Sequence, residues 1–178
     1  YLSERNNDTP GIKVYHKINS VFDNLSLAAV VNGSTFCVHG GISPGLDLDQ
    51  IQNITKPLQH DQLETKDING NQRDASKYNS LALNLMWSDP LTCVNEFRPN
   101  DTRGHGQFFG PRQVDEFLSA HDLKRIVRAH EKENNGFRDV FGNGRIITLF
   151  SAPNYCGEKN KGAIAIIDGM LIRFKHMK

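Results

Sequence analysis

Hydrophobic residues recur at a helical spacing in two segments of the chain. The first segment, residues 14–25, places five apolar side chains on one helical face: Val14, Ile18, Val21, Phe22 and Leu25. The second segment begins at Pro111, a residue favoured in the first helical turn, and ends at Ala120. Both segments predict amphipathic helices, and a shorter helix is expected at residues 48–54.

Short apolar runs bounded by turn residues predict strands in two parts of the chain. LAAVV and TFCVH are separated by Asn32-Gly33, a strong hairpin signal. The C-terminal part contains five further runs: KRIVRAH, GFRDVF, RIITLFSAP, GAIAIID and MLIRFKH. The turn residues between them, at 134–136, 142–144 and 168–169, predict hairpins. The segment LALNLMW fits both the helical and the strand period, so its type stays open.

The order of these elements predicts a mixed α/β (α+β) fold with a β-rich C-terminal portion. A length of 178 residues suits one domain. Residues 59–80 are polar and show no sustained period, so we expect a polar surface insertion there.

Composition narrows the possible partners. Hydrophobic residues make up 38% and charged residues 23% of the chain, as in ordinary folded proteins. The net charge of +1 favours neither nucleic acid nor an anionic membrane as a partner. No apolar run approaches the ~20 residues that cross a bilayer, and the polar N-terminal stretch does not resemble a signal peptide. The three cysteines favour a reducing compartment, the cytoplasm or the nucleus.

Two histidines occupy the same kind of place, directly after an apolar strand. His39 follows one predicted strand and His130 follows another. Ligand sites in open α/β sheets lie beyond the carboxyl ends of the strands, and a neutral imidazole there can bind a metal ion. Gly40-Gly41 would allow unusual backbone angles and a close approach to an ion. Each histidine can equally be a hydrogen-bonded structural residue, and both readings stay open at this point.

Arg103, Tyr155 and Trp87 are further candidates, each with a plain structural alternative. Arg103 lies in the glycine-rich stretch NDTRGHGQFFG, where its guanidinium could bind phosphate or be a solvated loop residue. Tyr155 lies on a loop after a buried strand, where its phenol could contact a ligand or pack with its hydroxyl hydrogen-bonded. Trp87 is expected to be core rather than functional. Cys156 is a possible accessible thiol on the same loop as Tyr155.

Four segments together resemble the serine/threonine phosphoprotein phosphatases, the PPP group that includes type-1, type-2A and calcineurin. They are FCVHGGISP, LMWSDP, RIVRAHE and ITLFSAPNYCGE, and NDTRG lies between them at a fitting distance. The resemblance implies a metallophosphoesterase-like β-sandwich flanked by helices. It also implies the hydrolysis of phosphoserine and phosphothreonine in phosphoprotein substrates, and possible regulatory subunits.

The resemblance also implies roles for four residues. His39 and His130 would be ligands of one of two divalent metal ions, manganese or iron and zinc. Arg103 would clamp the substrate phosphate, and Tyr155 would overhang the cleft. In such a site the two ions activate a water molecule that attacks phosphorus in line, and arginine stabilises the developing charge.

The family's signatures GD-x-HG, GD-x-x-DRG and GNHE do not occur in this chain. In the family they carry the other metal ligands and the proton-donating histidine. Residues 1–178 are therefore identified as similar to the C-terminal portion of one phosphatase catalytic domain, and we expect the isolated chain to be inactive. Its expected partner is the upstream half of the catalytic domain, or another polypeptide that covers the surface which that half would bury. The alternative is a catalytically incomplete component with a structural or binding role in an assembly.

Overall fold

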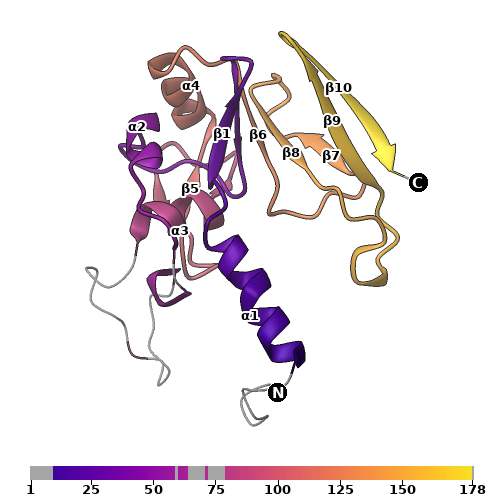
Figure 1. The fold of residues 1–178 in the computed structure, drawn as a ribbon. Coiled ribbons are helices and arrows are strands. Elements are labelled where there is room, and N and C mark those ends of the chain that lie inside the picture. Colours follow the sequence, from indigo (N-terminus) through magenta and orange to yellow (C-terminus); the bar gives the residue numbers. More distant parts are fainter. Residues whose placement is uncertain (1–9, 59, 64–70, 72–78, 178) are drawn as a thin grey trace. The chain divides into compact units, whose positions relative to one another are not determined.

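The computed structural model describes residues 10–58, 60–63, 71 and 79–177. Helices and several sheets occur in these ranges, which confirms the predicted mixed α/β class (Figure 1). The chain divides into two compact units, Tyr1–Ser26 with Ile54–Asn79 and Leu27–Asn53 with Ser80–Lys178. The predicted insertion at 59–80 lies mostly outside the described residues. Within them, no helix is long and apolar enough to cross a membrane.

The smaller unit contains α1 (Pro10–Phe22) and the short 3-10 helix η1 (His60–Leu63). Helix α1 confirms the helix predicted at residues 14–25, although it begins earlier and ends at Phe22. The backbone N–H of Leu58 donates to the carbonyl oxygen of Asp23 at 2.8 Å, which joins the two segments of this unit. Four apolar side chains of the predicted face are between 48% and 59% exposed: Val14, Ile18, Val21 and Phe22.

The larger unit is built on a five-stranded sheet with the strand order β1-β2-β6-β8-β7. The strands are β1 (Ala28–Val31), β2 (Thr35–Val38), β6 (Arg125–Arg128), β7 (Phe137–Asp139) and β8 (Ile146–Leu149). Strands β1 and β2 form the predicted antiparallel hairpin. Asn32 and Gly33 at its turn have φ of 50° and 61°, the left-handed conformation that this tight turn requires.

The three middle strands of this sheet, β2, β6 and β8, run parallel. The prediction that residues 134–136 form a hairpin turn is therefore wrong, because β6 does not pair with β7. Strand β7 instead pairs antiparallel with β8 across the predicted turn at 142–144. The physical reason lies in the sequence of β6 and β8, whose continuous buried runs suit central parallel strands covered on both faces.

Helix α4 (Pro111–Ala120) has the predicted bounds and the predicted inward face. Val114 and Leu118 are fully buried, and Phe117 is 7% exposed. The ring of Phe117 packs against that of Phe36 in β2, with ring centroids 5.1 Å apart. The helix therefore covers the sheet over the strands that end at the candidate histidines.

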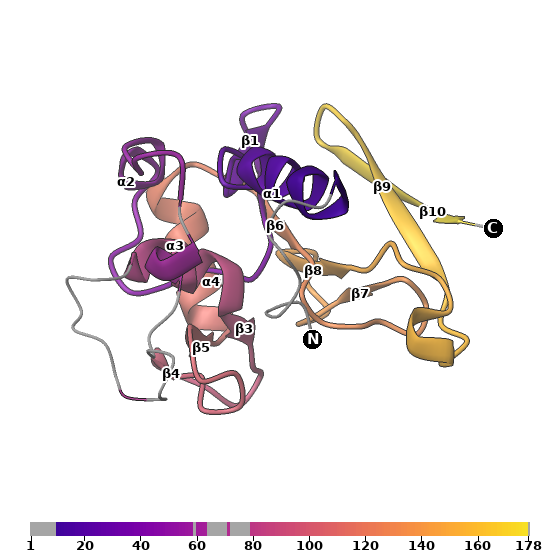
Figure 2. The same ribbon diagram turned by 60° about the horizontal axis from the view of Figure 1, so that its bottom comes forward.

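The remaining elements of the larger unit surround this core. They are α2 (Leu48–Gln52), α3 (Ser80–Trp87), β3 (Asp89–Pro90), β4 (Arg98–Pro99), β5 (Gln107–Phe109), β9 (Gly162–Asp168) and β10 (Leu171–Met177). Helix α3 is the segment whose type the sequence left open. Strands β3, β5 and β4 form a small sheet, and β9 and β10 form the predicted hairpin, which lies on the side of β7 and β8 in both views (Figures 1 and 2).

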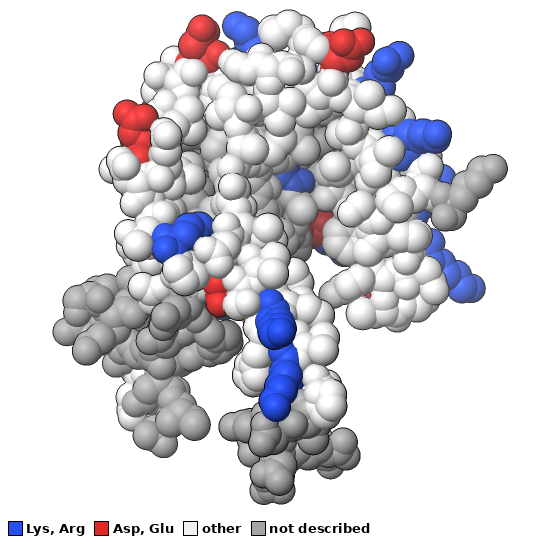
Figure 3. Space-filling view, viewed as in Figure 1, with Lys and Arg blue, Asp and Glu red and all other residues white. Residues whose placement is uncertain are grey.

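Acidic and basic side chains both appear on the face shown in Figure 3, among larger areas of uncharged surface.

Candidate metal and phosphate site

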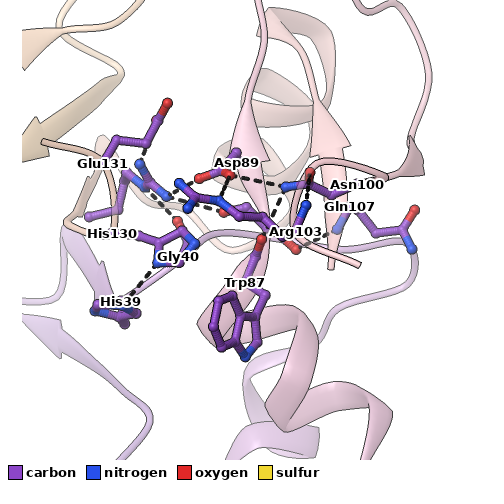
Figure 4. Close-up of polar contacts among 11 residues, drawn as sticks. His39, Gly40, Trp87, Asp89, Asn100, Arg103, Gln107, His130 and Glu131 are labelled. Atoms are coloured by element: carbon purple, nitrogen blue, oxygen red, sulfur yellow. Dashed lines mark hydrogen bonds and ion pairs between the residues drawn. The ribbon is translucent and has the colours of Figure 1, made fainter. Parts of the chain in front are cut away.

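The parallel pairing of β2 and β6 brings the two candidate histidines together. His39 follows β2 directly and His130 follows β6 by two residues. His130 Nδ1 lies 3.2 Å from His39 Nε2 (Figure 4), and the ring centroids are 5.1 Å apart. Neighbouring parallel strands end at the same edge of a sheet, so residues 91 positions apart meet there.

Backbone contacts hold these two strand ends in register. The N–H of Ala129 donates to the carbonyl oxygen of His39 at 3.0 Å, and the N–H of Gly40 donates to that of Leu85 at 2.7 Å. His130 itself has φ of 55°, a conformation that non-glycine residues adopt at a cost and that often occurs at functional sites. The imidazole of His130 is therefore directed by the fold and not by a preferred local conformation.

The expected role of Gly40-Gly41 needs correction. Neither glycine has a positive φ. A Cβ atom on Gly40 would lie 2.5 Å from the carbonyl carbon of Met86, and one on Gly41 would lie 2.3 Å from the ring of Phe109. Both glycines are thus needed for close packing against the end of α3 and against β5.

Both imidazoles have a pKa below the ordinary value, which favours the neutral form. Burial lowers the pKa of His39, and the charge of Arg128 lowers it further. Burial is also the largest cause of the lowered pKa of His130, which falls to about 4 although Asp89 opposes the shift. A neutral imidazole has a free nitrogen lone pair, which is the form that binds metal ions.

The histidine pair fits two ligands of one divalent ion. Two nitrogens bound to the same ion at about 2.1 Å each lie roughly 3.0–3.4 Å apart, and the observed separation is 3.2 Å. His130 Nε2 is buried without a hydrogen-bond partner, so this imidazole is only partly satisfied by the protein. Among the residues that the structure describes, no group of three or more His, Cys, Asp or Glu could hold a metal.

A buried arginine, which the sequence analysis did not single out, links the two strand ends to β3. Arg128 is 1% exposed. Its Nε donates to the carbonyl oxygen of Gly40 at 2.6 Å, its Nη1 to Glu131 Oε2 at 2.6 Å, and its Nη2 to Asp89 Oδ1 at 2.7 Å. The available signal was a charged residue inside each of two apolar segments, RIVRAH and LMWSDP. Buried charges are normally paired.

Asp89 connects this network to Arg103. Its Oδ2 accepts hydrogen bonds from Arg103 Nε at 3.1 Å and from Asn100 Nδ2 at 3.0 Å (Figure 4). Burial alone would raise the pKa of Asp89, but the charge of Arg128 and these hydrogen bonds outweigh it, so the pKa lies below its ordinary value. Asp89 is therefore an anion that holds Arg103 in place.

Arg103 keeps part of its guanidinium available. Its side chain is 34% exposed, and the ion pair with Asp89 uses Nε. The structure shows no partner for the two terminal nitrogens among the described residues. An arginine that is anchored at one edge and open at the other can bind a phosphate oxygen pair.

Trp87 and Tyr155 differ in how they relate to this site. Trp87 was expected to be core, but it is only half-buried, and its ring packs edge-on against His130 with centroids 5.2 Å apart. Tyr155 begins the 3-10 helix η3 (Tyr155–Gly157) and is 49% exposed. Its ring contacts that of Phe150, and the structure records no contact between it and the histidines or Arg103 within the described ranges.

Comparison with known proteins supports the resemblance of the sequence. The calcineurin-like phosphoesterase family matches residues 2–134. Over 174 residues the chain is 40% identical to serine/threonine-protein phosphatase BSL2 of Arabidopsis thaliana, covering 95% of this chain and 15% of that protein. A solved serine/threonine phosphatase of Saccharomyces cerevisiae, similar to human phosphatase PP5, has the same fold, with a TM-score of 0.71 and 24% identity over 97% of this chain and 53% of the other.

The chain thus spans 15% of the length of the first relative and about half that of the second. The strand ends, the paired histidines and the anchored arginine lie in segments that resemble the PPP group. On the match over residues 2–134, this chain belongs to the calcineurin-like phosphoesterase family.

Proposed function

We propose that the protein containing this chain hydrolyses phosphoserine and phosphothreonine in phosphoproteins, and that this chain supplies part of the active site. One observation carries the proposal: His39 Nε2 and His130 Nδ1 face each other at 3.2 Å, at the ends of two parallel strands. A purely structural role would not require the polar set of His39, Arg103, His130 and Tyr155 in one chain.

Each residue of the site has one task in this proposal. His39 and His130 hold one of two divalent ions, manganese or iron and zinc, and Arg103 binds the phosphate while Asp89 orients it. Tyr155 contacts the phosphorylated substrate from its exposed loop. When bound, the ions would supply a more acidic attacking water and neutralise charge on the phosphoryl oxygens. Arg103 would stabilise the same charge from outside the metal pair.

The remaining metal ligands and the proton donor would come from residues outside these 178, on the same polypeptide or on a partner chain. Two neutral histidines provide no negative charge to offset two dications. We therefore expect the isolated chain neither to bind two metal ions tightly nor to catalyse.

The test is phosphate release from a phosphoserine peptide by the protein isolated from its native source, with excess Mn²⁺. Full-length protein should release phosphate, and Arg103→Ala should reduce the rate by at least about a hundredfold. His130→Ala should also lower the rate of phosphate release. His176→Ala, on the exposed strand β10, is its matched histidine control and should leave that rate unchanged. If Mn²⁺-saturated native protein releases no phosphate, the proposed function is wrong.

A second candidate is a non-catalytic component of an assembly. It is favoured by the absence, within the described part of the chain, of a third ligand beside the histidine pair. The same assay separates the two, because a structural component would show no Mn²⁺-dependent turnover and no dependence on Arg103.

A further inference from the structure

The loop that carries Tyr155 adopts an unfavourable backbone conformation. Asn154, Cys156 and Lys159 have φ of 52°, 51° and 59°. L-residues avoid this left-handed region because Cβ crowds the backbone, and here three non-glycine residues adopt it within six positions. The rest of the loop must therefore supply contacts that hold the chain in this shape.

Asn160 makes those contacts. It is 5% exposed, and its Oδ1 accepts a hydrogen bond from the backbone N–H of Tyr155 at 2.7 Å. Its Nδ2 donates to the carbonyl oxygens of Ala152 at 2.8 Å and Lys161 at 3.0 Å. Its own carbonyl oxygen accepts from the N–H of Asn154 at 2.9 Å. One buried side chain thus connects both ends of the loop with its centre.

The direction of Tyr155 follows from this bracing. The backbone of Tyr155 is fixed through its N–H by Asn160, whereas its side chain is 49% exposed. Its ring lies perpendicular to that of Phe150, with centroids 5.3 Å apart and planes at 90°. Since about half of the side chain is exposed, the fixed backbone at Tyr155 limits the positions that the phenol can take.

We propose that Asn160 is the positioning residue of Tyr155. The inference rests on the proposed function in one respect, namely that Tyr155 contacts the phosphorylated substrate. Asn160 does not touch the substrate; it keeps the Tyr155 phenol in the orientation that binding requires.

The test compares Asn160→Ala and Asn160→Asp with Asn143→Ala in the full chain. Asn143 is a matched control, because its Oδ1 also accepts a backbone N–H, that of Arg145, in an exposed turn. Amide hydrogen exchange and the ring-proton shifts of Tyr155 are measured by NMR. Inorganic phosphate is then titrated into the full-length protein in the presence of Zn²⁺, a diamagnetic ion that does not broaden the Tyr155 signals.

Loss of the Asn160 contacts should speed hydrogen exchange of the Tyr155 amide about tenfold and shift the ring-proton signals of Tyr155. The exchange rates of amides in β6 and β8 should not change. In the Asn143→Ala protein, both the exchange of the Tyr155 amide and its ring-proton signals should stay as in the wild type. Lys159→Gly in the Asn160→Ala background should restore part of the protection, since glycine adopts positive φ without strain. A general loss of stability would raise exchange in β6 and β8 as well.

Asn160→Asp keeps the acceptor for the Tyr155 N–H and loses the donors to Ala152 and Lys161. The carboxylate is then no longer held by the two loop ends, so exchange of the Tyr155 amide should be faster than in the wild type and slower than in Asn160→Ala. If Asn160→Ala does not fold, wild-type exchange in Asn160→Asp overturns the proposal.

Wild-type exchange and ring shifts in both Asn160 variants would overturn the proposal. The proposal would also be overturned if exchange of the Tyr155 amide became faster in the Asn160 variants while their affinity for phosphate stayed unchanged. If phosphate leaves the Tyr155 resonances of the full-length wild-type protein unmoved, the role of Tyr155 in the proposed function is wrong. The exchange data still decide whether Asn160 holds the loop in shape.

Discussion

The network around Arg128 and the loop around Asn160 both order a candidate functional segment, but they do so with contacts of opposite range. Three of the four side-chain hydrogen bonds of Arg128 reach residues 39 to 88 positions away in the sequence, and the fourth goes to Glu131, three positions away. The side chain of Asn160 reaches no further than eight positions. The Arg128 network therefore forms only when the sheet is assembled, whereas the Asn160 contacts stay within one loop.

This difference separates what each region contributes. The Arg128 network ties the histidine pair and Arg103 to the same buried group, so a change there alters both stability and the site. The Asn160 loop can loosen while the sheet stays intact. Substitutions in the two regions should therefore have distinct signatures.

The largest effect is expected for Arg128→Met. This change leaves Asp89 and Glu131 without their shared buried cation, which should lower the free energy of unfolding by about 3–5 kcal/mol. Urea unfolding followed by the fluorescence of Trp87, the single tryptophan, measures it. Arg112→Met is the control, because Arg112 pairs with Glu116 at the surface and should leave the midpoint unchanged. Equal midpoints for the two variants would contradict the role of Arg128.

A smaller loss, about 2 kcal/mol at neutral pH, is expected for Asp89→Asn, because it breaks charged hydrogen bonds to Arg128 and Arg103. The folded-state pKa of Asp89 is lowered from 3.8, so its contribution is complete above that value and is lost as pH falls through the lower folded pKa. Unfolding curves of both proteins should therefore converge below pH 3.8. If the difference in unfolding free energy between the wild type and Asp89→Asn does not change with pH, the charge of the Asp89 carboxylate does not stabilise the fold.

Metal binding offers the next test of the histidine pair. Trp87 packs against His130, so its fluorescence should be quenched when Co²⁺ binds there. His39→Ala leaves this ring contact in place and removes one of the two ligands, and should weaken the apparent affinity at least about tenfold. His176→Ala should bind Co²⁺ like the wild type. If His39→Ala also binds Co²⁺ with wild-type affinity, the assignment of His39 as a metal ligand is wrong.

The smallest effect is expected for Lys132→Ala. Lys132 forms an ion pair with Glu158 in the Tyr155 loop, and the two side chains are 29% and 55% exposed. Exposed pairs of this kind contribute less than about 1 kcal/mol. Exchange of the Tyr155 amide should therefore stay within about twofold of the wild type. A larger change would mean that the ion pair, and not Asn160, holds the loop.

Local signals in the sequence were sufficient for several elements. The bounds of α4 followed from Pro111 and the spacing of its apolar residues, and the β1–β2 turn followed from Asn32-Gly33. The proximity of His39 and His130 was implied only by the resemblance to the PPP group, because nothing in the sequence indicated that the strands before them are parallel neighbours.

Features that depend on distant partners could not be read in the same way. The partners of Arg128 come from three separate segments, so its burial is decided only by the assembled fold. The requirement for Gly40 and Gly41 likewise comes from Met86 and Phe109, which lie far along the chain. The turn residues at 134–136 resembled a hairpin because local turn chemistry does not report which strand lies next in the sheet.

The most direct test of the central claim is ¹⁵N NMR of the histidine imidazoles as Zn²⁺ is added to the full chain. The account predicts that His39 Nε2 and His130 Nδ1 shift together, as the two nitrogens that face each other, while the ring nitrogens of His121 and His176 stay in place. If Zn²⁺ leaves both of these signals unmoved, the pair is not a metal site and the proposed phosphatase role loses the observation that carries it.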